Sequence, residues 1–300
     1  MSSLDWIAQR GIRAGLRMGL KLGGQLPLDL ELLRAGMNAT ARLFRPRREC
    51  EVSVTCMDGV RVTEVVTNNP HPEHVVVLMH GGAFFAGSAA THVAFAAEIA
   101  VRANARVVLP DYRLAPEHTF PAAQEDGLSV VRALLAQGVS PAELCFCGDS
   151  AGAAIALGMA LALKEAGMAQ PASLVLISPF VDLRLQAPSV RANSKLDPML
   201  SYTPLMRGAQ SYCGQIPLGD ARVSPLFADL RELAPMLIQC GSDEILLDDA
   251  LALTHAAKSA GLVVESEVYQ GMWHDFQLFA PWIDAADKAL WAIAEFIRRH

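Results

Sequence analysis

The chain has 300 residues, of which 52% are hydrophobic and 19% charged, so a disordered or low-complexity protein is excluded. A net charge of −6 argues against nucleic acid as a partner. The charge is uneven, because residues 1–50 contain nine basic and four acidic side chains and the remainder carries a net charge of −11. The N-terminal sixth is therefore chemically distinct.

Cysteine spacing and hydropathy limit the cellular setting. The six cysteines include no CxxC pair, so we expect reduced thiols and no metal site. No apolar run reaches the roughly 18 residues of a membrane span. Residues 6–22 are interrupted by basic side chains and do not resemble a signal peptide. We expect a cytoplasmic protein.

Two helices are predicted before residue 46. The first, residues 3–20, is followed by Lys21 and carries a basic stripe on one face, formed by Arg10, Arg13, Arg17 and Lys21. We favour a solvent-exposed face for this stripe, with a membrane-surface helix or a mobile cap over a site as alternatives. The second helix, residues 27–44, ends before Pro46.

The rest of the chain alternates between strand and helix patterns. Residues 50–66 alternate in hydropathy around Asp58-Gly59, which predicts a β-hairpin. Further strands are predicted at 75–79, 106–109, 143–147, 173–178, 236–240 and 263–268. Helices are predicted at 91–103, 121–137, 151–166, 247–260 and 284–299. This order indicates a mostly parallel sheet covered on both faces. Residues 185–225 break the rhythm and are predicted to be an insertion above the sheet.

A nucleophile motif follows the third of these later strands. Gly148-Asp149-Ser150-Ala151-Gly152 has the G-x-S-x-G pattern between a strand and a helix, the context in which a serine is presented on a tight turn. Ser150 is therefore the candidate nucleophile. Its hydroxyl needs a base, and in this arrangement an acid and then a histidine follow the serine along the chain.

His274 is the candidate base, because it lies in the loop after the last predicted strand. His255 lies within a helical pattern and His300 is terminal. Asp243 follows the strand at 236–240 and is the favoured acid. The competing acids are Glu244, Asp248 and Asp249.

The loop at 80–83 follows the strand at 75–79 and is glycine-rich. Backbone N–H groups in such a loop can stabilise the oxyanion of a tetrahedral intermediate. We predict Gly81, Gly82 and Ala151 as the donors, and we expect His80 to organise the loop.

These motifs resemble the hormone-sensitive-lipase family of α/β-hydrolases, in its bacterial esterase branch with a GDSAG elbow. The matching segments are HGGAFFAGS (80–88), DYRLAPEHTFPAA (111–123), GDSAG (148–152), ISPFVDL (177–183), SPLFADL (224–230), CGSDEILLDDA (240–250) and GMWHDF (271–276). The resemblance covers about residues 50–300. Ala83 departs from it, because the usual oxyanion loop has a third glycine there.

The resemblance implies an α/β-hydrolase fold with a mostly parallel eight-stranded sheet and helices on both faces. It implies a helical cap at 1–46 and 185–220 over a catalytic domain at 47–184 and 221–300. It also implies a Ser-His-Asp carboxylesterase for short- to medium-chain acyl esters, acting through an acyl-enzyme and without a cofactor. Arg113, Glu117 and Asp126 are expected to form a buried polar network.

The expected partner is a small-molecule ester, without nucleic acid or membrane contact. A homodimer through the last strand and helix is compatible with the apolar run at 292–297. Three other functions are compatible with parts of the pattern. A non-catalytic binding protein would be expected to lack a triad residue, whereas an amidase or a long-chain lipase could use the same triad. Hydrolysis of p-nitrophenyl esters separates the esterase from the binding protein.

Overall fold

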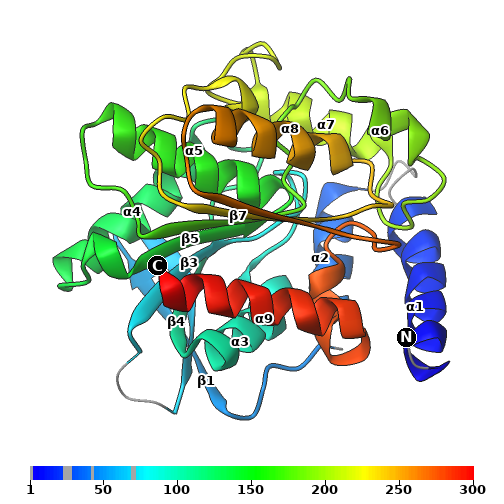
Figure 1. The fold of residues 1–300 in the computed structure, drawn as a ribbon, viewed down its shortest axis with the longest axis horizontal. Helices are drawn as coiled ribbons and strands as arrows, with labels where there is room; N and C mark the ends of the chain where they lie inside the picture. The colour runs from blue at the N-terminus through cyan, green and yellow to red at the C-terminus, as the bar shows by residue number, and fades with distance from the viewer. Residues whose placement is uncertain (1–2, 23–28, 42–43, 69–71) are drawn as a thin grey trace.

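A computed structural model describes the chain except residues 1–2, 23–28, 42–43 and 69–71 (Figure 1). Its centre is an eight-stranded sheet with the order β1-β2-β4-β3-β5-β6-β7-β8. The strands are β1 (Cys50–Met57), β2 (Val60–Thr67), β3 (His74–Met79), β4 (Ala105–Pro110), β5 (Leu144–Asp149), β6 (Ser173–Ile177), β7 (Met236–Gly241) and β8 (Val264–Tyr269).

The sheet is mostly parallel, as predicted. The β1-β2 hairpin turns at Asp58-Gly59, and β2 pairs antiparallel with β4. All later neighbours pair in parallel. The central strands read as continuous apolar runs because both faces are covered. Along β3, for example, Val77 belongs to the core on one face, whereas Val76 and Leu78 belong to the core on the other.

Two layers of helices supply this cover. The helices α4 (Ala122–Ala136), α5 (Ala151–Glu165) and α8 (Leu247–Ser259) pack on one face. The helices α3 (Ala89–Ala103) and α9 (Asp284–Arg299) pack on the other (Figure 1). In α9 the side chains of Ile293, Phe296 and Ile297 are buried in the chain's own core. The apolar run at 292–297 therefore packs within the chain itself.

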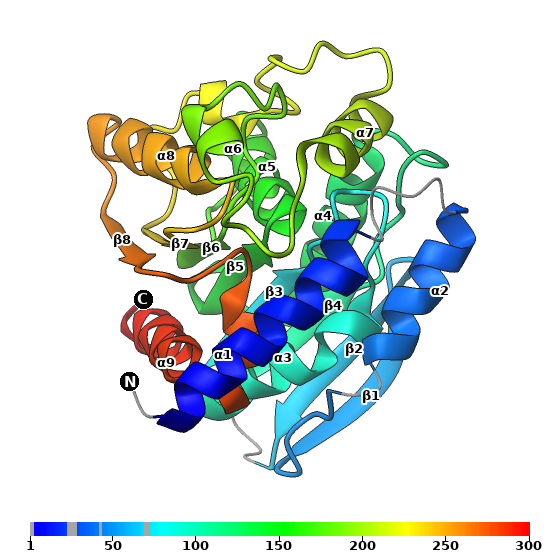
Figure 2. The ribbon, with the colours of Figure 1, turned by 90° about the vertical axis from the view of Figure 1, so that its right-hand side faces the viewer.

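Four further helices lie over one end of the sheet. They are α1 (Ser3–Leu16), which continues as a π-helical segment (Arg17–Leu22), α2 (Leu30–Ala41), α6 (Pro188–Ala192) and α7 (Tyr202–Cys213). Figure 2 shows α1 and α2 in front of the strands, with α6 and α7 above them. The second predicted helix is shorter than expected, and residues 27–28 and 42–43 of its predicted range lie outside the described part. We call these four helices and the loops between α6 and α7 the cap.

Short 3₁₀ segments complete the described structure at Pro141–Glu143, Pro225–Phe227 and Phe276–Trp282. The last strand, β8, is at the sheet edge and is only half-buried, although its apolar residues had predicted a buried strand. The cysteines Cys50, Cys56, Cys145, Cys147, Cys213 and Cys240 are all free thiols. Among the described residues, no helix combines the length and the apolar character needed to cross a membrane.

Candidate active site

Ser150 lies at the sharp turn between β5 and α5. Its backbone has φ 54° and ψ −119°, a strained conformation that presents the side chain at the head of the helix. The Ser150 N–H donates to the Ile177 carbonyl on the neighbouring strand over 2.8 Å. The turn also requires Gly152, because a Cβ there would lie 2.0 Å from the Met79 carbonyl oxygen. The predicted elbow is therefore present.

His274 lies in the loop after β8, and its acidic partner is Glu244. The Nδ1 atom of His274 is 2.8 Å from Oε2 of Glu244, and both side chains are almost completely buried. The other carboxylate oxygen, Oε1, accepts hydrogen bonds from the Gly241 N–H and the Ser178 hydroxyl. Glu244 is thus fixed in orientation and in turn fixes the imidazole ring.

The prediction that Asp243 holds His274 is wrong. The carboxylate of Asp243 instead accepts a hydrogen bond from Arg13 over 2.7 Å, at the rim of the cap. Its N–H donates to the Met272 carbonyl, which sets the direction of the turn after β7. The two adjacent side chains point to opposite sides of this turn. Asp243 faces Arg13 in the cap, and Glu244 faces the imidazole ring of His274.

The oxyanion loop also differs from prediction at one residue. The Gly81 N–H donates to Oδ2 of Asp149 over 3.0 Å and is therefore committed to the protein itself. In the part of the chain that the structure describes, the N–H groups of Gly82 and Ala83 donate no hydrogen bond. Ala151 begins α5, where a backbone N–H has no partner within the helix. Gly82, Ala83 and Ala151 are thus the available donors, and Gly81 is not.

A buried polar cluster of His92, Asp149 and His80 contacts the oxyanion loop. His92 on α3 places Nε2 3.2 Å from Oδ2 of Asp149. Burial opposes both charges, but their mutual attraction outweighs it, so the pKa of Asp149 is lowered and that of His92 is raised. His80 stacks on Tyr112, and burial lowers its pKa to about 3, so it is neutral. His80 contacts the Gly81 carbonyl, in agreement with an organising position.

The basic stripe on the N-terminal helix ties the cap together. Arg13 donates to the carbonyl of Gly271 as well as to Asp243. Arg17 donates to the carbonyl of Lys195, and Lys21 donates to the carbonyls of Ser194 and Asp197. Our favoured interpretation of a solvent-exposed face holds for Arg10 and Arg17, which are exposed, and is wrong for Arg13 and Lys21, which are half-buried. Arg13, Arg17 and Lys21 fasten α1 to the insertion and to the loop that carries His274.

The second cap helix is fastened by Arg34. Its guanidinium binds both oxygens of Glu117 and also the carbonyls of Phe85 and Ala115. The buried polar network expected for Arg113, Glu117 and Asp126 is therefore divided, and of the three only Asp126 is buried. Arg113 pairs with Asp126 over 2.9 Å, whereas Glu117 belongs to the cap contact.

We expect Arg13→Met to raise KM and to lower kcat/KM about tenfold, since one charge-assisted hydrogen bond contributes about 1.5 kcal/mol. The reason is that the variant releases α1 from the loop before His274. Arg10→Met is the matched control, because Arg10 stacks on the exposed Trp6 of the same helix. Steady-state kinetics on one ester measures KM and kcat/KM for the two variants. Equal KM values for the two variants would contradict the role assigned to Arg13.

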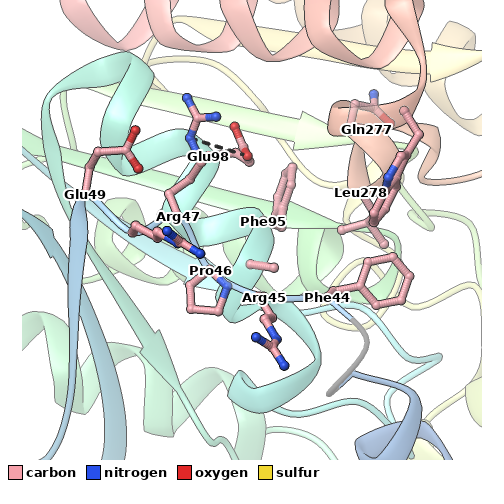
Figure 3. Close-up of a pocket in the computed structure, with 12 residues that line it drawn as sticks. Phe44, Arg45, Pro46, Arg47, Glu49, Phe95, Glu98, Gln277 and Leu278 are labelled. Carbon is pink, nitrogen blue, oxygen red and sulfur yellow. Dashed lines mark ion pairs between the residues drawn. The ribbon is translucent and has the colours of Figure 1, made fainter.

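Three cavities lie under or beside the cap. A cavity of about 120 Å³ is lined by Ser150, His274 and Gly82. It adjoins an apolar cavity of about 510 Å³ beneath α1 and α2, with Gly82 and Met199 shared between them. A third cavity of about 540 Å³ is lined in part by residues 44–49 (Figure 3), and Ser150 is not among its lining residues. In Figure 3 a dashed line marks the ion pair between Arg47 and Glu98, two of the residues that line this third cavity.

Known proteins share both the sequence and this architecture. Residues 76–278 match the α/β-hydrolase fold family. The chain is 41% identical to an esterase of Acinetobacter venetianus, covering 91% of this chain and 90% of that protein. It is 36% identical to an acetyl-hydrolase of Streptomyces hygroscopicus (74% and 75% covered) and 30% identical to an ethyl acetate hydrolase of Pseudomonas putida (83% and 82% covered).

Solved structures agree with these relatives. An esterase of the bacterial hormone-sensitive lipase family superimposes with a TM-score of 0.93 at 32% identity, with 97% of each chain covered. Another esterase, soaked with p-nitrophenyl butyrate, has a TM-score of 0.91 at 32% identity, with 97% of this chain and 98% of that chain covered. The fold and these matches define an α/β-hydrolase. Within that class, the chain belongs to the hormone-sensitive-lipase family of esterases, as its motifs implied.

Proposed function

We propose that this protein hydrolyses short- to medium-chain carboxylic esters through a Ser150–His274–Glu244 triad. The observation that carries the proposal is the geometry of His274. Its Nδ1 is held at 2.8 Å by a buried glutamate, and its ring shares a cavity with a serine on a nucleophile elbow. A nucleophile, a base and an orienting acid are the three groups that acyl transfer needs.

The reaction follows from these positions. Ser150 Oγ attacks the ester carbonyl carbon while His274 Nε2 takes the serine proton. Glu244 keeps the Nδ1 proton of His274 in place and stabilises the imidazolium. The oxyanion is stabilised by the N–H groups of Gly82, Ala83 and Ala151.

Collapse of the intermediate then breaks the ester C–O bond, and His274 protonates the departing alkoxide. Water, deprotonated by His274, attacks the acyl-enzyme in the second half of the cycle. The second intermediate then collapses, the bond between the acyl carbon and Ser150 Oγ breaks, and His274 returns its proton to Oγ, which releases the carboxylic acid and restores the triad.

The size of the cavity supports the short- to medium-chain class. The space directly at Ser150 is about 120 Å³, and the adjoining apolar space is about 510 Å³. The names of the relatives, acetyl-hydrolase and ethyl acetate hydrolase, point to small acyl groups in those proteins. We infer that the small cavity receives the ester carbonyl and that one apolar half of the substrate extends under α1 and α2.

A series of p-nitrophenyl esters from acetate to palmitate tests the proposal. We expect kcat/KM to be highest between acetate and hexanoate and to fall steeply for palmitate, whose chain exceeds the space under the cap. A fluorophosphonate probe that labels active serines should attach to Ser150 and abolish the activity. Folded protein that turns over no ester, or that prefers palmitate, would contradict the proposed function.

A further inference from the structure

The imidazole ring of His274 lies between two carboxylates. Glu244 binds Nδ1, and Oδ2 of Asp275 lies 3.0 Å from Nε2 on the opposite side of the ring. All three side chains are almost fully buried. The proposed mechanism uses Nε2 as the atom that takes the serine proton. Asp275 therefore occupies the position at which His274 has to work.

Ser150 does not compete for this position in the structure. Within the described residues, the Ser150 hydroxyl makes no hydrogen bond, although Ser150, His274 and Asp275 line the same small cavity. The Nε2 atom of His274 is thus paired with Asp275 and not with the nucleophile. A proton on Nε2 is stabilised in this arrangement, because a carboxylate lies on each side of the ring.

The backbone holds Asp275 firmly in this place. Its φ of 52° and ψ of 35° put it in the left-handed region, and its N–H donates to the hydroxyl of Ser178 over 3.2 Å. The same hydroxyl donates to Glu244, so one serine links the two carboxylates. The second oxygen of Asp275, Oδ1, is buried and has no hydrogen bond in the described part of the chain. His274 is accordingly the side-chain partner of Asp275.

The other charges around the ring come from several elements. Asp149 at the end of β5 faces Asp275 and is paired with His92 on α3, and neutral His80 lies beyond them. Behind Glu244 lie Asp197 in the insertion and Asp249 at the start of α8. Asp149 is compensated by His92, so Glu244 and Asp275 dominate the field at the ring.

We propose that Asp275 is a positioning residue that binds Nε2 of His274 in the resting enzyme. Asp275 keeps the proton on Nε2 up to a higher pH, and so raises the pH at which this nitrogen can act as the base for Ser150. The inference rests on the proposed function. At low pH the proton of Nε2 is shared with Asp275. As the pH rises the proton leaves to water, and the lone pair of Nε2 becomes available to the serine hydroxyl.

The electrostatics agree in sign with this geometry. Burial alone would lower the pKa of His274, but the charges and hydrogen bonds of Asp275 and Glu244 outweigh it and raise the pKa well above its usual value. Burial raises the pKa of Asp275 to about 7. Removing the charge of Asp275 should therefore lower the pKa of His274 and extend activity toward acid.

The test is the pH profile of kcat/KM for Asp275→Asn. Asparagine tolerates the left-handed backbone, so the variant changes the charge and preserves the turn. We expect the acid limb to move down by about one pH unit or more, which is the usual effect of one nearby charge. Asp58→Asn is the matched control, because Asp58 also has a positive φ, of 46°, but lies exposed in the β1-β2 turn.

Proton NMR of the free enzyme provides a readout independent of turnover. As the pH rises, the Nε2 proton signal of His274 should disappear at a lower pH in Asp275→Asn than in the wild type, whereas the Nδ1 proton signal should remain in both proteins. Coincident pH profiles and NMR transitions in the two proteins would overturn the inference. So would a uniform loss of rate in Asp275→Asn without movement of the acid limb. Absence of ester turnover in the wild type would instead refute the proposed function, and the NMR titration would still test Asp275.

Discussion

Ser150→Ala should reduce ester hydrolysis by about 10⁵-fold or more, because loss of a triad nucleophile removes the acyl-enzyme route and leaves only oxyanion stabilisation and binding. The side chain is 3% exposed, and its loss changes little volume, so the variant should fold normally. Initial rates on p-nitrophenyl acetate, together with thermal unfolding of both proteins, measure the effect.

The comparison also separates chemistry from binding. Because the oxyanion donors are backbone groups and remain in place, the Ser150→Ala variant should still bind a slowly reacting ester with a similar dissociation constant. Residual hydrolysis above about 1% of the wild-type rate, in a sample free of contaminating esterase, would show that another group is the nucleophile.

The second large effect distinguishes two neighbouring acids. Glu244→Gln should lower kcat about 10³- to 10⁴-fold, because the amide cannot stabilise the imidazolium and favours the wrong ring tautomer. Asp243→Asn should stay within about tenfold of the wild type, because Asp243 contacts Arg13 and not His274. Parallel steady-state kinetics on the two variants decides between them.

Folding has to be checked for the buried position in particular. Glu244 also accepts hydrogen bonds from Gly241 and Ser178, so Glu244→Gln can lose stability as well as rate. Thermal unfolding measures the loss of stability. Dividing the rate by the number of active serines that the fluorophosphonate probe labels corrects kcat for inactive protein. A greater loss in Asp243→Asn than in Glu244→Gln would restore the acid predicted from the sequence.

Periodicity and spacing were sufficient for the architecture. The six predicted later strands and the hairpin all appear. Five of the six are buried on both faces, and such a strand leaves a continuous apolar run, whereas β8 lies at the sheet edge and is only half-buried. The elbow at Ser150 was equally predictable, since its glycines and its place between strand and helix are local properties. The hairpin turn at Asp58-Gly59 belongs to the same kind of local signal.

The wrong predictions concern the direction in which a side chain or a backbone N–H group points, and a sequence pattern does not determine that direction. Asp243 and Glu244 are adjacent, and the turn after β7 decides which of them meets His274. Gly81 is excluded as an oxyanion donor, and Ala83 is not, because the Gly81 N–H binds Asp149, which is 68 residues away in the chain. The contacts of Asp275 and His92 likewise depend on tertiary packing. The one available signal was the unusual density of ionisable residues in the motifs at 243–249 and 274–275.

The fastening of α1 has a consequence for how the protein is made. Arg13 is synthesised well before its partners Asp243 and Gly271, which follow 230 and 258 residues later. During synthesis the helix α1 therefore lacks these partners until residue 271 has left the ribosome. A chain that stops before residue 271 lacks both His274 and the carbonyl that anchors the helix. Closure of the cap and completion of the catalytic groups thus depend on the same late segment around residues 271–274, so a product truncated before it cannot form a closed, reactive site.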